Sequence, residues 1–216
     1  MSTSVLIIGE SGTGKSASLR NLNPDETLLI QAVRKPLPFR STGWKPFVKG
    51  VSGGSIFVTD KSHEIVIAMQ KTARKIIVID DFQYILSNEF MRRNDERGFD
   101  KFNDIGRHAW DILNTANDLA SDVRVYILGH TSTDEQGRIK AKTIGKMLDD
   151  KITVEGLFSI VLRTVKINDD YYFSTQNNGF DTCKSPMQMF ESNYIDNDLN
   201  ATDKIICDYY NLTQPA

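Results

Sequence analysis

The stretch Val5-Leu-Ile-Ile-Gly9-Glu-Ser-Gly-Thr-Gly-Lys-Ser16 decides the fold of this chain. Residues 5–8 are apolar and mostly β-branched, which predicts a short buried strand, and residues 15–22 read as a helix that ends before a proline. The loop between them matches the pattern G-x-x-x-x-G-K-[ST] at every fixed position. Strand, glycine-rich loop and helix in this order predict an α/β fold of the P-loop NTPase type.

The residues of this loop suit a nucleoside triphosphate. Its glycines let successive backbone N–H groups turn toward phosphate oxygens, and the following helix directs the positive end of its dipole at them. We expect Lys15 to reach the β- and γ-phosphates and the Ser16 hydroxyl to bind Mg²⁺. GTP is disfavoured because the sequence has no Asn-Lys-x-Asp tetrad to read guanine, so the expected ligands are ATP and Mg²⁺. The residues expected to bind them are Gly9, Glu10, Ser11, Gly12, Thr13, Gly14, Lys15, Ser16 and Ala17.

A second acidic element follows at Lys75-Ile-Ile-Val-Ile-Asp80-Asp81. Its apolar run predicts a buried strand that delivers Asp80 to the carboxyl end of the sheet, where ligands bind in such folds. We expect Asp80 to contact the magnesium shell. Asp81 is a candidate catalytic residue that polarises the attacking water, and the alternative is that it caps the following turn.

A histidine ends a further apolar strand. Residues 123–128 predict this strand, and Gly129-His130-Thr131 follow it. His130 is a candidate catalytic residue that senses the γ-phosphate, and the alternative is a loop histidine without such a role.

The remaining pattern alternates strands with helices. Such alternation predicts a mainly parallel sheet with helices on both faces. A β-hairpin is expected where two apolar runs flank Asn168-Asp169-Asp170. One domain is expected over residues 1–190, and residues 191–216 are expected to be a tail with a short helix near 203–209 that packs on it. The other expected strands are 27–30, 56–58 and 76–79, the expected helices are 65–73 and 99–119, and the hairpin strands are 158–165 and 171–175.

Charge limits how the chain could meet nucleic acid. A net charge of -2 argues against a protein that coats nucleic acid with its whole surface. A local basic strip over residues 137–151 remains, and it could touch single-stranded DNA through Arg138, Lys140, Lys142 and Lys146.

Two further cations belong to the expected hairpin. Arg163 and Lys166 are candidates for a finger that reaches the nucleotide of a neighbouring subunit in trans, or they are solvated strand residues.

The composition points to a reducing compartment. Cys183 and Cys207 are too few and too irregularly spaced for a disulfide framework or a metal site, so both are expected to be structural thiols. The first residues lack the pattern of a signal peptide, and no window has the length of a membrane span. We therefore expect a cytoplasmic protein without a membrane partner.

Seven shorter motifs add a resemblance to a known family. With the P-loop and the Asp80 strand, the chain resembles the phage-encoded ATPases with a RecA core, in particular the RecA-like single-strand annealing proteins of phage recombination. The motifs are Lys35-Pro-Leu-Pro-Phe39, Asp81-Phe-Gln-Tyr84, Asn88-Glu-Phe-Met-Arg-Arg93, Asp100-Lys-Phe102, Gly129-His130-Thr131, Lys142-Thr-Ile-Gly-Lys146 and Lys184-Ser-Pro-Met187.

This resemblance implies a topology and a set of partners. The strand before Gly129 would lie between the P-loop strand and the Asp80 strand, so that His130 faces the γ-phosphate. The chain would assemble into rings or filaments on single-stranded DNA in the cytoplasm of a bacterial host, with nucleotide between subunits and a cognate single-strand-binding protein as a further partner. RecA proteins carry a catalytic glutamate after the second strand, whereas this chain has Ile30-Gln31-Ala32 there, so hydrolysis is expected to rely on another group or to be slow.

Two other classes of protein remain open from the residues alone. A nucleotide kinase also uses a P-loop, but Arg92, Arg93 and Arg97 would have to serve as its lid. An AAA-type loader would bind ATP and meet DNA only through another protein, and the acidic pI of about 5.9 favours it.

Overall fold

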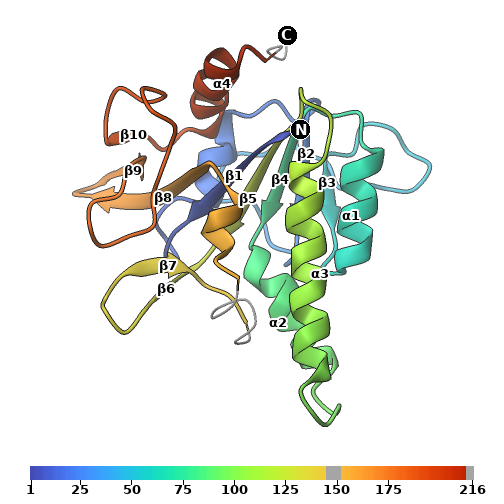
Figure 1. Cartoon of the computed structure of the whole chain (residues 1–216). Helices are drawn as coiled ribbons and strands as arrows, with labels where there is room; N and C mark the ends of the chain where they lie inside the picture. The colour runs from blue at the N-terminus through green and yellow to red at the C-terminus, as the bar shows by residue number, and fades with distance from the viewer. Residues whose placement is uncertain (145–151, 213–216) are drawn as a thin grey trace.

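Eight strands form one sheet with helices on both faces (Figure 1). The computed structural model describes residues 1–144 and 152–212. The strands of the sheet are β1 (Thr3–Ile8), β2 (Thr27–Gln31), β3 (Ile56–Val58), β4 (Ile76–Asp80), β5 (Arg124–Gly129), β8 (Ile160–Ile167), β9 (Asp170–Ser174) and β10 (Tyr194–Asp196). The helical elements are η1 (Ser16–Asn21), α1 (Ser62–Lys71), α2 (Phe82–Arg92), α3 (Asp100–Asn117), η3 (Val154–Leu157) and α4 (Leu199–Tyr210).

The order of the strands is β10-β9-β8-β1-β5-β4-β2-β3. The strands from β8 to β3 are parallel, whereas β9 and β10 add to the β8 edge antiparallel. The expected α/β architecture with a mostly parallel sheet is therefore confirmed, and so is the hairpin at residues 168–170. The strand that ends in Gly129 lies between the strand before the glycine-rich loop and the strand of Asp80, an order compatible with a P-loop fold.

Both faces of the central strands are covered, which explains their continuous apolar sequence. In β1, Leu6 and Ile8 pack in a core shared with α1, α2 and α3, whereas Val5 and Ile7 pack in a second core shared with η1 and α4. All four side chains are buried. Successive side chains of a strand point to opposite faces, so β1 is anchored in both cores. This anchoring fixes the start of the glycine-rich loop at the carboxyl edge of the sheet.

Several local expectations need correction. The helix after the glycine-rich loop is the short 3₁₀ helix η1, because the chain turns at Leu22 before the proline. The helix α2 begins at Phe82, where no helix was expected. Part of the basic strip forms strand β7 (Ile139–Ala141), which pairs with β6 (Thr131–Thr133) in a separate two-stranded sheet.

A buried ion pair fastens α4 to the sheet. Arg124 in β5 donates from Nε and Nη2 to the two carboxylate oxygens of Asp203, each at 2.9 Å, and Tyr126 donates its hydroxyl to the same carboxylate. The Arg124 side chain has no exposed surface. The helix itself begins at Leu199, where the Asp198 carboxylate accepts hydrogen bonds from the first backbone N–H groups.

None of the helices described is long and apolar enough to cross a lipid bilayer.

Candidate functional site

A cavity of about 570 Å³ lies at the carboxyl edge of the parallel strands. The ends of β1, β4 and β5 meet at this edge, which is where ligands bind in open parallel sheets. The side chains of Lys15, Ser16, Lys35, Asp81, His130 and Tyr171 line the cavity. The structure thus brings most of the sequence-predicted site residues to one place, together with two side chains that were not expected there.

The backbone of the glycine-rich loop adopts conformations and close contacts that residues other than glycine could reach only with strain. Gly12 and Gly14 have φ values of 81° and 98°, in the left-handed region that glycine adopts at little cost. A Cβ on Gly9 would lie only 1.9 Å from the Thr164 hydroxyl oxygen on β8. The loop is also tied to β8 by a hydrogen bond of 2.6 Å between the hydroxyls of Thr13 and Thr164. Its glycines are therefore required by conformation and by close packing.

Lys15 lies folded over the loop. Its ammonium group donates hydrogen bonds of 2.7 and 2.8 Å to the backbone carbonyls of Gly9 and Glu10. Burial lowers the pKa of Lys15, and the negative charges of Asp81 and Asp80 oppose that effect. The loop therefore holds a buried cation whose present partners are carbonyls that a phosphate could replace.

Ser16 and Asp80 are in direct contact. The Ser16 hydroxyl lies 3.0 and 3.1 Å from the two carboxylate oxygens of Asp80, which is 1% exposed. Burial, followed by the charge of Asp81, raises the pKa of Asp80. A hydroxyl and a carboxylate side by side are hard oxygen donors of the kind that Mg²⁺ takes, so these two residues fit the ion expected from the sequence.

Asp81 has an unusual backbone for a residue other than glycine. Its φ and ψ are 66° and 52°, and it is 4% exposed. It occupies the position before α2, yet its side chain makes no capping hydrogen bond to that helix. Instead its carboxylate contacts the cavity residues Lys35 and His130, with Asp81 Oδ1 3.4 Å from His130 Nε2. The strained backbone thus turns the carboxylate toward the cavity.

His130 is held in place from two sides. Its backbone N–H donates to the Gln83 side-chain oxygen at 3.1 Å, and its ring meets the Tyr84 ring edge-on with 6.1 Å between centroids. Burial and the nearby charge of Lys15 lower the pKa of His130. The neutral ring has one N–H to donate and one nitrogen to accept, so it is suited to a polar contact in the cavity.

Lys35 begins one of the motifs that carry the resemblance, but its sequence context predicts no role for it at the site. It follows β2, and it forms ion pairs with both Asp80, at 3.7 Å, and Asp81. Burial lowers the pKa of Lys35, but the two carboxylates outweigh burial and raise it overall. In the sheet, Gln31 at the end of β2 lies opposite Asp80. The residues that follow β2, Lys35 among them, are therefore close to the two aspartates, and the strand register is the signal that points to Lys35.

The two candidates for a trans finger have partners within this chain. Arg163, opposite Ile8 in the sheet, donates from Nε to Asp181 at 2.9 Å, and 18% of its side chain is exposed. Lys166 lies 3.4 Å from Asp169 and 5.6 Å from the centre of the Tyr171 ring at the cavity.

The basic strip is joined directly to His130. Lys142 donates its backbone N–H to the His130 carbonyl at 2.8 Å, and Lys140 lies on β7 opposite Ser132 of β6. Arg138 lies at the turn between these strands, where its N–H donates to the Asp134 carboxylate at 2.8 Å. The fourth cation of the expected DNA contact, Lys146, lies outside the described residues.

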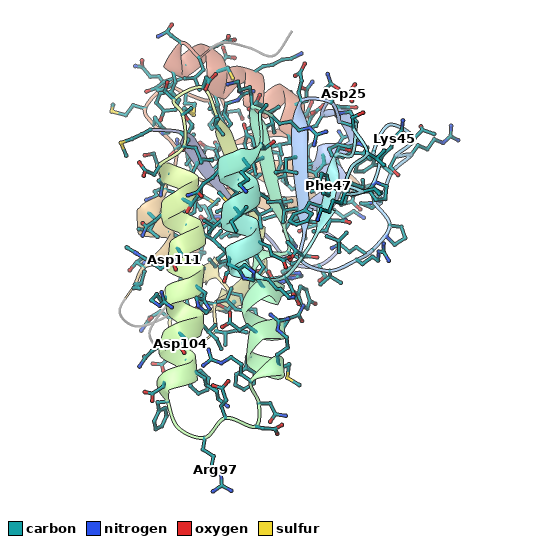
Figure 2. The ribbon with its side chains drawn as sticks, turned by 90° about the vertical axis from the view of Figure 1, so that its right-hand side faces the viewer. Asp25, Lys45, Phe47, Arg97, Asp104 and Asp111 are labelled. Carbon is teal, nitrogen blue, oxygen red and sulfur yellow. The ribbon has the colours of Figure 1, made fainter. Side chains whose placement is uncertain are left out.

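The arginines that a kinase lid would need lie elsewhere. Arg92 pairs with Asp60 at 2.7 Å, and Arg93 pairs with Glu96 and Asp104. Figure 2 shows Arg97 at the tip of the connection between α2 and α3. None of the three arginines lines the cavity.

The chain matches no protein-family model and no curated protein, so its function has to be inferred from these residues.

Proposed function

We propose that this chain binds ATP with Mg²⁺ in the cavity and hydrolyses the γ-phosphate. The observation that carries the proposal is the contact of Ser16 with Asp80 beside the buried ammonium of Lys15. An accidental glycine-rich turn would not need a lysine, a serine and a carboxylate from another strand in this arrangement.

The proposed roles follow from the present contacts. Lys15 exchanges its loop carbonyls for the β- and γ-phosphates, while the loop N–H groups and the start of η1 hold the remaining phosphate oxygens. Ser16 and Asp80 would hold Mg²⁺, which neutralises charge on the phosphates when bound. Asp81 would accept the proton of the attacking water, and His130 would contact the γ-phosphate.

Hydrolysis of ATP is expected to be slow. Gln31 stands at the end of β2, beside Asp80, where the RecA proteins that the chain resembles have a glutamate. A neutral amide can orient a water molecule but cannot take its proton, so Asp81 is left as the base. Asp81 is already paired with Lys35, so that ion pair has to open before the carboxylate can contact a water molecule.

For the biological role, we propose a RecA-core ATPase that binds single-stranded DNA and promotes strand annealing or pairing in phage recombination. Two features support this choice: β5 lies between β1 and β4, and the β6–β7 hairpin begins directly at His130. ATP would order an oligomer, a ring or a filament, and hydrolysis would release it. The alternative is an AAA-type loader that reaches DNA through another protein. A nucleotide kinase is disfavoured because Arg92 and Arg93 are paired elsewhere and neither they nor Arg97 line the cavity.

One set of assays separates these proposals. We would measure phosphate release from ATP with and without single-stranded DNA, and phosphoryl transfer to a panel of nucleosides and nucleoside monophosphates. DNA-stimulated release is expected. Release that DNA leaves unchanged would favour the loader, and transfer to a nucleoside or a nucleoside monophosphate would establish the kinase. The absence of ATP binding would overturn the proposal. Electron microscopy with an ATP analogue and single-stranded DNA then tests for rings or filaments.

A further inference from the structure

The connection between β2 and β3 has the most one-sided charge in the chain. We call residues 32–55 the basic loop. It carries five cations and no aspartate or glutamate, although the whole chain has a net charge of -2. The cations are Arg34, Lys35, Arg40, Lys45 and Lys49.

Lys35 differs from the other cations of the basic loop, which are exposed. Arg34, Arg40, Lys45 and Lys49 all face solvent, and none forms an ion pair with a carboxylate of residues 1–144 or 152–212. Figure 2 shows Lys45 projecting from the side of the molecule, with Phe47 beside it. By contrast, three arginines elsewhere, Arg92, Arg93 and Arg163, each pair with a carboxylate. A group of like charges kept free in this way is suited to an anionic partner.

The structure holds this loop in a defined shape. Trp44 is buried, at 8% exposure, and its ring meets the Phe39 ring edge-on at 6.4 Å. Ser55 donates its N–H to the Lys45 carbonyl at 2.8 Å, and Phe47 donates its N–H to the Ile56 carbonyl at 2.6 Å. The charges are therefore presented by a preformed surface, which lowers the entropic cost of binding.

An exposed aromatic ring lies among these charges. Phe47 is 54% exposed, and its ring is propped edge-on against Phe57 at 5.9 Å. Lys45 and Lys49 precede and follow it by two residues. Cations for a phosphate backbone and an aromatic face for bases are the combination that binds single-stranded nucleic acid without sequence preference.

The basic loop is also connected to the nucleotide cavity. Lys35 belongs to the loop and pairs with Asp80 and Asp81, while Pro36 and Pro38 line the cavity. A ligand that changes the partners of Lys35 would act on the first part of the same segment that carries the exposed cations. A loop linked to the nucleotide cavity is suited to bind the substrate of the ATPase, and the substrate in the proposed function is DNA. We therefore favour a nucleic-acid strand over an anionic membrane as the partner of the basic loop.

We propose that the basic loop, through Arg40, Lys45, Lys49 and Phe47, is a binding surface for single-stranded DNA. The choice of DNA rests on the proposed function, and the surface is distinct from the β6–β7 hairpin. Phosphates of the strand lie against the cations, and a base stacks on the exposed face of Phe47.

The charge part of the proposal is tested by the salt dependence of binding. We would measure the affinity for a fluorescein-labelled oligothymidylate by anisotropy over a salt series, with the double variant Lys45→Gln/Lys49→Gln. The slope of log Kd against log salt should fall by roughly 1.4, since each lost phosphate contact removes about 0.7. The matched control is Arg107→Gln/Lys204→Gln, which removes two exposed cations from α3 and α4 and should leave the slope unchanged. Equal slopes in the loop variant and the wild type would overturn the proposal.

The stacking part is tested at Phe47. Phe47→Leu keeps an apolar side chain but loses the aromatic face, and it should weaken oligothymidylate binding roughly tenfold at constant salt. Phe99→Leu is the control, because Phe99 is 83% exposed at the connection between α2 and α3 and should have no effect. A thermal melt of each variant excludes unfolding as the cause. Equal affinities for Phe47→Leu and the wild type would overturn the stacking contact.

Two further measurements distinguish this inference from the proposed function. Binding of a fluorescent ATP analogue should be the same in the loop variant and the wild type. Absence of analogue binding, with loop-dependent DNA binding retained, would overturn the ATPase and leave the loop assignment intact. Flotation with phosphatidylserine vesicles tests the other partner, and loop-dependent vesicle binding without loop-dependent DNA binding would overturn the assignment to DNA.

Discussion

The ammonium group of Lys35 lies against both carboxylates at the end of β4, 3.7 Å from Asp80 Oδ2 and in an ion pair with Asp81. The two carboxylates are almost fully buried, so without a nearby cation their charges would oppose each other in a poorly solvated place. Lys35 supplies that cation from the chain itself. Because Asp80 is also the expected magnesium ligand, Lys35 and Mg²⁺ compete for the same negative charge.

Replacing Lys35 should therefore make the stability of the protein depend on magnesium. Lys35→Met should destabilise the protein by about 1–2 kcal/mol without Mg²⁺, between the values for exposed and fully buried ion pairs, because 37% of the side chain is exposed. Millimolar Mg²⁺ should restore more stability to the variant than to the wild type. Thermal melts with EDTA or MgCl₂ measure this difference. The neighbouring Arg34→Met is the control, and equal magnesium responses in all three proteins would contradict the prediction.

Replacing Lys15 should abolish tight ATP binding. The Lys15→Ala variant loses the one buried ammonium of the glycine-rich loop, and two charge-assisted hydrogen bonds to phosphate account for about 100-fold in affinity or more. Circular dichroism should show an intact fold, because the side chain packs against loop carbonyls and not in the core. Titration of a fluorescent ATP analogue measures the effect, with the exposed Lys71→Ala as control. Equal affinity in Lys15→Ala and the wild type would remove the P-loop assignment.

The two neighbouring aspartates should affect different steps. Asp80→Asn should weaken the dependence of nucleotide binding on magnesium, since Asp80 contacts Ser16. Asp81→Asn should keep nucleotide affinity and lower turnover by about 10² or more, the usual contribution of a general base. Asparagine tolerates the left-handed backbone found at Asp81, so the fold should be kept. Normal hydrolysis by Asp81→Asn would show that this residue is not the base.

The β6–β7 hairpin gives a prediction of its own. Lys140→Ala/Lys142→Ala should flatten the salt slope of single-strand binding by roughly 1.4 if both cations touch the DNA backbone, with ATP affinity unchanged. The contact of Lys142 with the His130 carbonyl runs through its backbone, so the substitution leaves that hydrogen bond in place. A lost DNA stimulation of hydrolysis with an unchanged slope would instead place these lysines at a neighbouring nucleotide.

The cysteines should be unreactive in the native protein. Burial and then Asp181 raise the pKa of Cys183 to about 12, and burial and then Asp203 raise that of Cys207 to about 11. Since the thiolate is the reactive form, near pH 8 only about one in 10⁴ and one in 10³ of these thiols are ionised. A disulfide reagent should therefore modify both thiols only as fast as the protein unfolds. Rapid modification of either thiol at pH 8 would contradict its native burial.

The sequence was sufficient where local signals and topology agreed. The run from Val5 to Ile8 and the apolar residues before Asp80 are buried on both faces, and their continuous apolar pattern identified both strands. The loop motif then indicated which edge of the sheet carries the site, since parallel strands share their carboxyl ends. Residues with these strong local signals lie where they were expected.

The features that were missed depend on distant residues. Lys35 and Asp81 are 46 positions apart, and no local pattern pairs a lysine after one strand with an aspartate after another. The helix α2 starts with residues that pack on β5, because Gln83 accepts a hydrogen bond from His130, 47 positions away. Such long-range contacts outweigh local propensity, which explains why α2 was not predicted.

The buried ion pair of Arg124 and Asp203 links β5 to a residue 79 positions further along the chain. During synthesis, β5 and the strands on either side of it in sequence leave the ribosome well before this carboxylate does. Burying a guanidinium group without its partner costs several kcal/mol, so this face of β5 favours contact with water until α4 docks on it. The central strands therefore cannot reach their final packing while the chain is still short of α4, and the docking of that helix marks the completion of folding.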